Sequence, residues 1–520
     1  MRLTTRRQER RYMESTGYVF VTPELSPYFK ITGVGDLLQN IIGELARRNL
    51  RVAVICPDFG VDPRHLRFTK SMSIYSTSNG QPTSLQVKFA RDDRGVDYFF
   101  IKDEEIQRYL SEASSLRLRR DKVGRNCLTF CYGAYLILDA LCRGEMDFPV
   151  NRLVMHAFHW QTSPLVALID QAPWRDRVRT VLTADILDIQ GRFESKVLET
   201  HEIYRLLKPA FEQEINFLRL GIKKADVLHT VSPNYALEIQ HAPHGRGLES
   251  LLKERYQQGR LIGILNGLDP QNLDWRQIPV LRDHDLAVSL EAKNLLEQKQ
   301  RAKLLFQRTA GLPQDPSAFL ISMGHRFVRQ KNFNLVAKAM EELMALEPRP
   351  QIYLRAWPEP CQGDADWDLW WQIVRLSKRF RHNLAFFSPF DRDQSLMNEG
   401  VFIDRFLYYA ASDLFLMPSL WEPCGLCQLE AMHFGAIPLV TTVGGLIDTV
   451  KPFTGENEGW GFHLKDPFDS KALVELVAQA MDLWANHPCV WHGMVRRAMS
   501  FESSITQTVD NYLNRLYTPG

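Results

Sequence analysis

The sequence lacks both a long hydrophobic run and an excess of charge of one sign. No apolar run approaches the roughly 18 residues of a membrane-spanning helix, and the start of the chain lacks the apolar core of a signal peptide. Its 63 basic and 61 acidic residues give a formal net charge of +2, whereas charge-driven binding to nucleic acid or membranes needs a basic surplus or stripe. We therefore expect a soluble, cytoplasmic protein that binds neither nucleic acid nor membrane.

Cysteine is too sparse and too scattered for a structural metal site. The chain has eight cysteines, and the only pair spaced as CxxC is Cys424 with Cys427. A zinc site would need a second pair or histidines at matching spacing. We expect these two thiols to be reduced, in the turn and the first helical residues that follow it, and we expect no structural zinc site.

The first fifteen residues are rich in arginine, with five residues of that type. Such a segment suits an organelle transit sequence, which would place the protein in a plastid. Transit peptides avoid acidic residues, however, and Glu9 and Glu14 interrupt this one. A disordered basic tail over 1–15 is therefore the favoured interpretation.

Short apolar runs alternate with segments of helical periodicity along most of the chain. Predicted strands lie at 18–22, 51–57, 98–101, 153–155, 180–183 and 226–232, and a second series at 318–323, 351–355, 385–387, 414–417 and 436–440. This alternation is typical of α/β folds with doubly wound parallel sheets. It predicts two Rossmann-like domains facing across a cleft, over 16–258 and 259–494. We expect the C-terminal segment, 495–520, to form a helix over 495–517 that returns to the first domain.

The stretch 413–450 combines two predicted strands, a helix over 428–434 and two glycine turns around Glu422. Ligands of open α/β sheets bind outside the carboxyl ends of the strands, which makes Glu422 a candidate site residue. The alternative is an ordinary strand-helix-strand unit with a solvated glutamate. Candidate backbone donors for an anion, at the helix start and at the second turn, belong to Gly425, Leu426, Cys427, Gly444 and Gly445.

Two other loops carry lysine or arginine where phosphate would bind. Lys30 precedes Gly33 and Gly35, which let a ligand approach the backbone near a helix amino end. Arg326 and Lys331 follow the strand 318–323, and a guanidinium fork with an ammonium suits a diphosphate. Solvated basic loops are the alternative interpretation for both.

A cluster of tryptophans suggests either a sugar-stacking platform or a core stripe. Trp357 lies nearby, but Trp367, Trp370, Trp371 and Val374 fall on one face of a predicted helix. That spacing favours a buried core stripe.

Several longer motifs occur in a fixed order along the chain. They are PELSPYFKITGVGD, ADVLHTVSPNYALEI at 225–239, GRGLESLL at 245–252, GILNGLD at 263–269, HRFVRQK at 325–331, LMPSLWEPCGLCQLEAM and GGLIDTV. Together they resemble the bacterial glycogen synthase and plant starch synthase family, glycosyltransferases of the two-domain GT-B architecture. The resemblance implies transfer of glucose from ADP-glucose to the non-reducing end of an α-1,4-glucan, with retention of configuration and with no metal and no cofactor.

The resemblance also implies roles for individual residues. By similarity, Arg326 and Lys331 would hold the donor diphosphate, and Lys30 would approach the same donor from the other domain with the backbone of its loop. Glu422 would hold the glucose hydroxyls. Asp121, in RRDKVGRN, resembles the acid that lines the acceptor side.

The chain departs from the family motifs at four places. Thr32 replaces a glycine of the phosphate turn, and Asn332 replaces the glycine after the lysine. The family's His-Asp-Trp reads Phe158-His159-Trp160 here, so Phe158 replaces a histidine that binds the donor sugar. The Thr-x-His-Asn segment reads Thr183-Ala184-Asp185-Ile186 here, so that its polar His-Asn pair is lost.

Three functions fit this sequence. The first is an active α-glucan synthase with an altered acceptor side. The second is a related retaining glycosyltransferase with another acceptor or nucleotide sugar. The third is a catalytically weak homologue that binds glucan or regulates a partner, for which Phe158 and Asp185 are the motivation.

Overall fold

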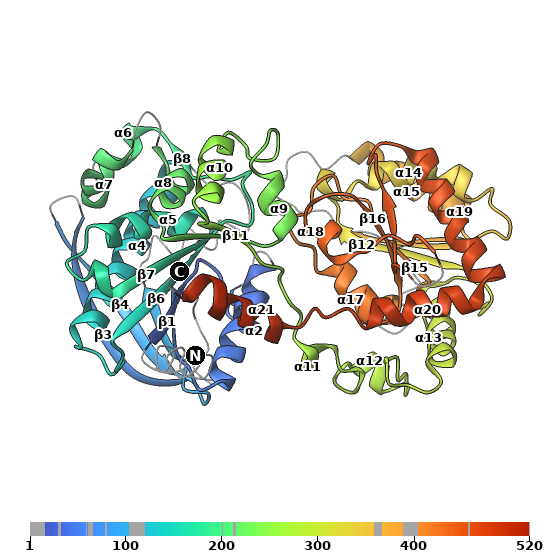
Figure 1. Ribbon diagram of the computed structural model, residues 1–520, viewed down its shortest axis with the longest axis horizontal. Helices are drawn as coiled ribbons and strands as arrows, with labels where there is room; N and C mark the ends of the chain where they lie inside the picture. Colours follow the sequence, from blue (N-terminus) through green and yellow to red (C-terminus); the bar gives the residue numbers. More distant parts are fainter. Residues whose placement is uncertain are drawn as a thin grey trace, which may run out of the picture. The chain divides into compact units, whose positions relative to one another are not determined.

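The computed structural model describes residues 16–29, 33–58, 60, 66–78, 81–102, 120–199, 201–211, 215–357, 367–387, 404–455 and 458–518. These residues form two compact units (Figure 1). Unit 1 contains the described residues up to Asn266 and those from Ile505 onward, and unit 2 runs from Gly267 to Ser504. Among the described residues, no helix is both long enough and apolar enough to cross a membrane.

Unit 1 is built on a mixed sheet that has nine strands in the described part of the chain, in the order β11-β10-β7-β6-β1-β2-β5-β4-β3. All neighbours from β11 to β5 pair in parallel, whereas β4 is antiparallel to both β5 and β3. A separate short pair joins β8 to β9. The strands are β1 (Thr16–Val21), β2 (Arg51–Pro57), β3 (Arg67–Ser78), β4 (Gln81–Arg91), β5 (Asp97–Lys102), β6 (Arg152–Phe158), β7 (Val178–Thr183), β8 (Arg192–Phe193), β9 (Ile215–Asn216), β10 (Val227–Thr230) and β11 (Leu261–Gly263).

Helices cover both faces of this sheet because its central strands are apolar on both sides. Alternate residues of β1 point to opposite faces, so Val19 and Val21 join one buried cluster while Tyr18 and Phe20 join another. The helices are α2 (Val34–Arg47), α4 (Arg120–Arg143), α5 (His159–Asp170), α6 (Ser195–Leu198), α7 (Glu202–Leu207), α8 (Phe217–Lys224), α9 (Pro233–Glu238), α10 (Glu249–Gln257) and α21 (Ile505–Asn511), with short 3-10 turns at Arg175–Arg177 and Lys208–Ala210 and a π-helical turn at Tyr512–Tyr517.

The end of the chain completes the core of unit 1. Helix α21 packs beside α2 (Figure 1), where Arg48 and Asp510 form an ion pair of 2.5 Å. The hydroxyl of Tyr517 is hydrogen-bonded to Nδ1 of buried His156 at 2.8 Å. The C-terminal segment therefore packs on the first unit, as the sequence predicts.

Unit 2 is built on a parallel sheet with the order β14-β13-β12-β15-β16-β17. Its strands are β12 (Leu320–Arg326), β13 (Gln351–Trp357), β14 (Leu384–Phe387), β15 (Leu414–Met417), β16 (Ile437–Thr441) and β17 (Phe462–Leu464). Its helices are α11 (Pro270–Leu273), α12 (Pro279–Arg282), α13 (Leu295–Ala310), α14 (Phe333–Leu343), α15 (Trp367–Arg379), α16 (Arg405–Ala411), α17 (Cys427–His433), α18 (Gly444–Thr449), α19 (Ser470–Asn486) and α20 (Pro488–Met499), with 3-10 turns at Trp275–Gln277 (η4) and Arg329–Lys331 (η5).

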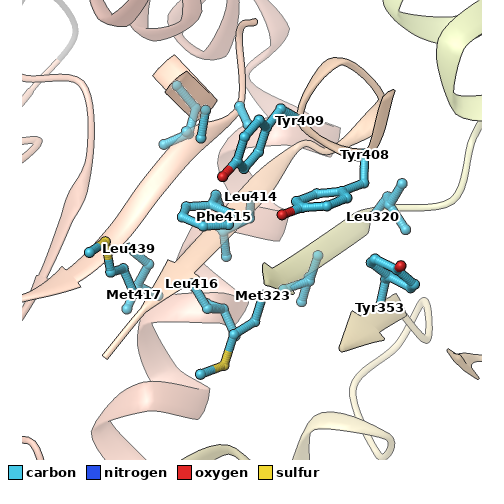
Figure 2. Packing of buried hydrophobic residues seen from close by; sticks show 14 of the residues in the cluster. Leu320, Met323, Tyr353, Tyr408, Tyr409, Leu414, Phe415, Leu416, Met417 and Leu439 are labelled. Atoms are coloured by element: carbon cyan, nitrogen blue, oxygen red, sulfur yellow. The ribbon is translucent and has the colours of Figure 1, made fainter. Parts of the chain in front are cut away.

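The core of unit 2 lies where this sheet meets its helices. Figure 2 shows Tyr408 and Tyr409 of α16 beside Phe415 of β15, with Met323 of β12 and Tyr353 of β13 in the same cluster. The rings of Tyr409 and Phe415 meet edge to face, with centroids 5.3 Å apart. Each of these five side chains is buried, so β12 and β15 are held firmly side by side.

Four predictions about the fold need correction. The units divide at 266/267 and 504/505, not at 258/259 and 494/495, because β11 still pairs with β10 in unit 1 and α20 packs in unit 2. The first sheet is not purely parallel, because β4 and β3 form a hairpin that we did not predict. The predicted helix over 495–517 is broken between α20 and α21.

The tryptophan stripe is the fourth correction. Trp370 is buried at 4% exposure, but Trp367 and Trp371 are 51% and 56% exposed. Only one of the three indoles of α15 therefore belongs to the core. Trp357 lies at the end of β13, and its side chain is outside the described residues.

Candidate functional site

Lys331 and Glu422 form a buried ion pair at the carboxyl edge of the unit 2 sheet. Lys331 ends the turn η5 that follows β12, and Glu422 lies between β15 and α17. The ammonium of Lys331 donates to Oε2 of Glu422, and the hydroxyl of Ser419 donates to the same oxygen at 3.1 Å. Both residues are buried, with Lys331 8% and Glu422 7% exposed. The two residues that the sequence singled out in separate motifs are thus in direct contact.

The position of this pair is where an open α/β sheet forms its ligand crevice. From β12 the chain proceeds outward through β13 to β14, and from β15 it proceeds in the other direction through β16 to β17. The strand order therefore reverses between β12 and β15. Ligands bind outside the carboxyl ends of the strands at such a reversal, and Lys331 and Glu422 occupy that place.

The second glycine turn, at Gly444 and Gly445, packs against the loop that carries Glu422. The amide of Gly445 donates to the carbonyl oxygen of Glu422 at 3.1 Å. A Cβ atom on Gly444 would overlap that same carbonyl, and one on Gly445 would collide with the backbone of Cys424. These glycines allow two backbone segments to touch. Our expectation that this turn offers free amides to an anion is wrong for Gly445, since its N–H is already bonded to the protein.

The first turn, at 423–425, leads directly into α17. Gly425 has a φ of +75°, which favours glycine. Leu426 is the N-cap of α17 and Cys427 its first residue. Cys424 and Cys427 carry free thiols, as predicted. Binding of phosphate by the backbone of Gly425, Leu426 and Cys427 stays a prediction.

Asn332, which stands where the family has glycine, adopts the conformation that glycine would. Its φ is +58° and its ψ +41°, a left-handed geometry that asparagine tolerates better than other side chains. Its amide Nδ2 donates to the carbonyl of Pro467 at 2.7 Å. This departure therefore leaves the turn that carries Lys331 intact.

A branched side chain at this position should disturb that turn. We expect Asn332→Val to lower the free energy of unfolding by about 1–2 kcal/mol, the penalty of left-handed backbone for an ordinary residue. Asn332→Gly serves as the matched control, because it keeps the conformation and loses only the hydrogen bond. Chemical denaturation of the two variants checks this, and equal stabilities would contradict it.

Arg326 ends β12 and is exposed. Lys331 lies in the turn that follows the same strand, so both predicted cations are at one edge of the unit 2 sheet. Unlike Lys331, Arg326 lies on the surface.

The structure describes only some of the predicted site residues of unit 1. Lys30 and Thr32 lie outside the described residues, and Asp121 lies in the first turn of α4 with its side chain outside them. Gly33 is the N-cap of α2, and a Cβ atom there would meet nothing within 4 Å. Gly35 is buried in the first turn of that helix. The open space at Gly33 is compatible with the predicted approach of a ligand.

Phe158 contributes to the core of unit 1. Its side chain is fully buried, with ring centroids 4.3 Å from His156 and 6.3 Å from Phe20. The residue that replaces the family histidine therefore offers no polar group to a sugar.

The neighbouring His159 is held between two carboxylates. Its Nδ1 lies 3.0 Å from Oδ1 of Asp185 and its Nε2 lies 3.4 Å from Oε1 of Glu24. Burial disfavours a charged imidazole, but Asp185 and Glu24 outweigh it and raise the pKa of His159 to about 10. Although burial opposes it, His159 in turn lowers the pKa of Asp185.

Ile186 does remove one polar side chain of the family's His-Asn pair, but Asp185 has a polar partner in His159. In the family motifs the acid stands at the place of His159 and the histidine at the place of Asp185. The two residue types have exchanged places, and in this chain their side chains lie 3.0 Å apart. Sequence reasoning missed this, as it missed Glu24 and Ser419. The reciprocal change of an acid and a histidine in two motifs was the available signal for the exchange.

Among the described residues, no group of three or more histidines, cysteines and acids is arranged to hold a metal ion. The charged side chains at the carboxyl edges of the two sheets include the ion pairs Lys331–Glu422 and His159–Asp185. The chemistry that these groups offer is hydrogen bonding and charge stabilisation of a polar, anionic ligand.

Comparisons with known proteins agree with this picture. Residues 18–254 match the family model described as starch synthase catalytic domain, and residues 405–488 match that of glycosyl transferases group 1. The chain is 30% identical to the glycogen synthase of Anaeromyxobacter sp. (strain Fw109-5), over 95% of this chain and 97% of the relative. It is also 30% identical to that of Clostridioides difficile (strain 630), over 95% and 98%.

Solved structures share the fold. The catalytic domain of starch synthase IV from Arabidopsis thaliana, bound to ADP and acarbose, aligns with a TM-score of 0.77 at 22% identity, covering 96% of this chain and 98% of that one. Sucrose-phosphate synthase from Thermosynechococcus elongatus aligns with a TM-score of 0.54 at 15% identity, with the same coverage. The predicted GT-B class of two Rossmann-like units is thereby confirmed.

Proposed function

The chain belongs to the glycogen synthase family of glycosyltransferases, and we therefore propose that it transfers glucose from ADP-glucose to the non-reducing end of an α-1,4-glucan, with retention of configuration. Family membership, carried by the two relatives above, supports a glucosyltransferase that uses a nucleotide sugar and a glucan. The choice of ADP as the leaving nucleotide belongs to the proposal.

The contact between Lys331 and Glu422, at the point where the strand order of unit 2 reverses, is the observation that best supports the proposed chemistry. An ammonium has three N–H donors, so the bond to Glu422 leaves others for a diphosphate. A carboxylate accepts several hydrogen bonds, so Glu422 can bind sugar hydroxyls beside the phosphate. A cation and an acceptor in contact suit a ligand whose diphosphate and hydroxyl groups are adjacent.

The proposed mechanism depends on fixed charge. Departure of a nucleoside diphosphate builds negative charge on the leaving oxygen. Preorganised cations in a buried site stabilise such charge more than they would in water. Lys331 is buried and held by Glu422, and Arg326 would add a bidentate fork from the same strand end. We propose that these residues stabilise the departing diphosphate without a metal, so that chelation by EDTA leaves the rate of glucosyl transfer unchanged.

A donor panel tests the proposed function. ADP-, UDP- and GDP-glucose are each offered with glycogen and with maltose, and incorporation of labelled glucose is measured. The proposal expects incorporation into glycogen with ADP-glucose as the best donor. Incorporation only from another nucleotide sugar, or only into another acceptor, would favour a related retaining glycosyltransferase.

A second candidate is a catalytically weak homologue that binds glucan or regulates a partner. The observation in its favour is Phe158, which is buried in the core where the family has a sugar-binding histidine. Glucan binding without turnover in the same panel would establish it. A cytoplasmic location, expected from the sequence, remains part of the proposal, with a plastid as the alternative.

Arg326 allows a separate test of the diphosphate site. We expect Arg326→Ala to weaken binding of ADP by about 1.5–3 kcal/mol, the range for hydrogen bonds to charged groups. Isothermal titration calorimetry measures this, with the exposed Arg282 of α12, paired with Asp283, as the control substitution. An unchanged affinity for ADP would remove Arg326 from the site.

A further inference from the structure

The cluster of Glu24, His159 and Asp185 lies at the carboxyl edge of the unit 1 sheet. Glu24 follows β1, His159 opens α5 directly after β6, and Asp185 follows β7. The strands lie in the order β7-β6-β1-β2. From β1 the chain proceeds to β2 on one side, and from β6 it proceeds to β7 on the other. The order therefore reverses between β1 and β6, and the cluster occupies the end of that reversal, where such sheets bind ligands.

The backbone at His159 is in a conformation that ordinary residues avoid. Its φ is +66°, and left-handed backbone in a residue other than glycine persists only when its surroundings hold it. The hydroxyl of Thr162 donates to the carbonyl of Phe158 at 2.8 Å and to that of His159 at 3.1 Å. The ring itself bridges the other two segments. Residues held in this way concentrate at functional sites.

The three side chains of the cluster are largely buried, but each keeps a small exposed fraction. The side chain of Glu24 is 2% exposed, that of Asp185 10% and that of His159 12%. His159 is the cation that lies between these two buried carboxylates. Removing the cation would leave two carboxylates facing each other, which drives proton uptake or movement apart. The geometry of all three segments thus depends on His159.

We propose that His159, held between Glu24 and Asp185, is a positioning residue for glucosyl transfer, fixing the segments after β1 and β7 at the crevice where unit 1 receives its sugar. This inference rests on the proposed function. The chemical class of its ligand is a hydroxyl-rich pyranose. Gly33, whose backbone is a predicted donor contact, lies nine residues beyond Glu24 in the sequence.

A reciprocal exchange tests the inference. In His159→Asp three carboxylates meet, and in Asp185→His two imidazoles share Glu24. We expect each single variant to lower kcat about 100-fold, the effect of misplacing a reacting group by about 1 Å. In the double variant H159D/D185H the histidine–aspartate contact is restored with its two members exchanged, which is the arrangement of the family motifs, while the carboxylate at 159 rather than an imidazole faces Glu24. We expect its kcat to return to within a few-fold of the original enzyme.

The control is an exchange at the far end of the same helix. Asp170, at the end of α5, forms an ion pair of 2.7 Å with Lys224, at the end of α8, and Arg175 lies 3.8 Å from the same carboxylate. We expect Asp170→Lys, Lys224→Asp and their combination to leave kcat unchanged. All variants are assayed well below their melting temperatures, with folding verified by circular dichroism. A role limited to stability would change the melting temperatures of the His159 and Asp185 variants but not the kcat of the folded enzyme, and that result would overturn the proposal.

Failure of the proposed function can be told apart from failure of this inference. If the enzyme is active and the double variant stays as impaired as the singles, only the inference is wrong. If no donor supports transfer, the proposed function is wrong, and calorimetric affinity for maltoheptaose becomes the deciding measurement. The inference then expects affinity to be lost in the single variants and recovered in the exchange. Unchanged affinity throughout would overturn it.

The charge of His159 gives an independent pH test. The folded-state pKa of about 10 lies above the ordinary 6.5. Its contribution to stability is therefore complete below about pH 6.5 and is lost as the pH rises towards 10. Asp185 and Glu24 face the ring directly, and Tyr235 and His229 are further titratable groups near Asp185. We expect the stability advantage of the original protein over His159→Asn to shrink steadily between about pH 6.5 and 10. A constant advantage would contradict a charged His159.

Discussion

Lys331→Met is expected to lower kcat/KM for glucosyl transfer by about 10²–10³-fold, the effect of removing one fixed donor that stabilises developing charge. It should also destabilise the protein by about 3–5 kcal/mol, because Glu422 stays buried without its cation. Lys331→Arg keeps the charge and is expected to retain more activity than the methionine variant. Steady-state kinetics and chemical denaturation measure the two effects separately.

Lys303 offers a matched control for this variant. Its ammonium lies 2.6 Å from Oδ2 of Asp413, and both side chains are buried. That pair lies at the amino end of β15, the opposite edge of the same sheet. Lys303→Met should destabilise unit 2 to a similar degree, yet folded enzyme should keep its kcat. Equal losses of kcat in both lysine variants would show that lost stability, not lost chemistry, explains the result for Lys331.

Truncation after Ser504 is expected to prevent unit 1 from folding. It removes α21 and the turn at Tyr512–Tyr517, and with them buried side chains that fill one face of the unit 1 sheet. These are Ile505, Val509, Tyr512, Leu513, Leu516 and Tyr517. Each large buried side chain contributes about 2–5 kcal/mol, so their sum exceeds the total stability of a typical domain. The Arg48–Asp510 ion pair is lost as well.

Limited proteolysis and calorimetry detect this outcome. We expect unit 1 to be cleaved rapidly while unit 2 keeps its own thermal transition, because none of the described residues beyond Ser504 belongs to the unit 2 core. Truncation after Thr518, which retains Tyr517, is the control and should behave like the full chain. Unchanged protection of unit 1 in the shorter variant would contradict the packing described for the C-terminal segment.

Much of this architecture follows from local sequence patterns. The predicted strands 51–57 and 414–417 coincide with β2 and β15. In a chain where strands alternate with helices, a short run of β-branched and aliphatic residues is typical of a strand that is buried on both faces. The candidate residues Lys331 and Glu422 follow adjacent strands. Their meeting was therefore predictable from the rule that parallel strands bring their carboxyl ends to one edge.

The failures have physical causes that a single sequence does not reveal. The β3–β4 hairpin has many serines, threonines and charged residues, so its strands lack the apolar signal of the central ones. Helical spacing placed three tryptophans of α15 on one face, but the sheet covers only part of that face. His159 follows β6, whereas the two carboxylates that face it follow β1 and β7. No local pattern connects Glu24 with Asp185.

The measurement that tests the central claim most directly is transfer of labelled glucose from ADP-glucose to glycogen by the original enzyme and by Glu422→Gln. The substitution keeps the size of the side chain and its hydrogen-bonding carbonyl but removes the charge that holds Lys331. We predict incorporation by the original enzyme and a loss of about 10²-fold or more in the variant. Equal incorporation by both proteins would contradict a donor site built on the Lys331–Glu422 pair.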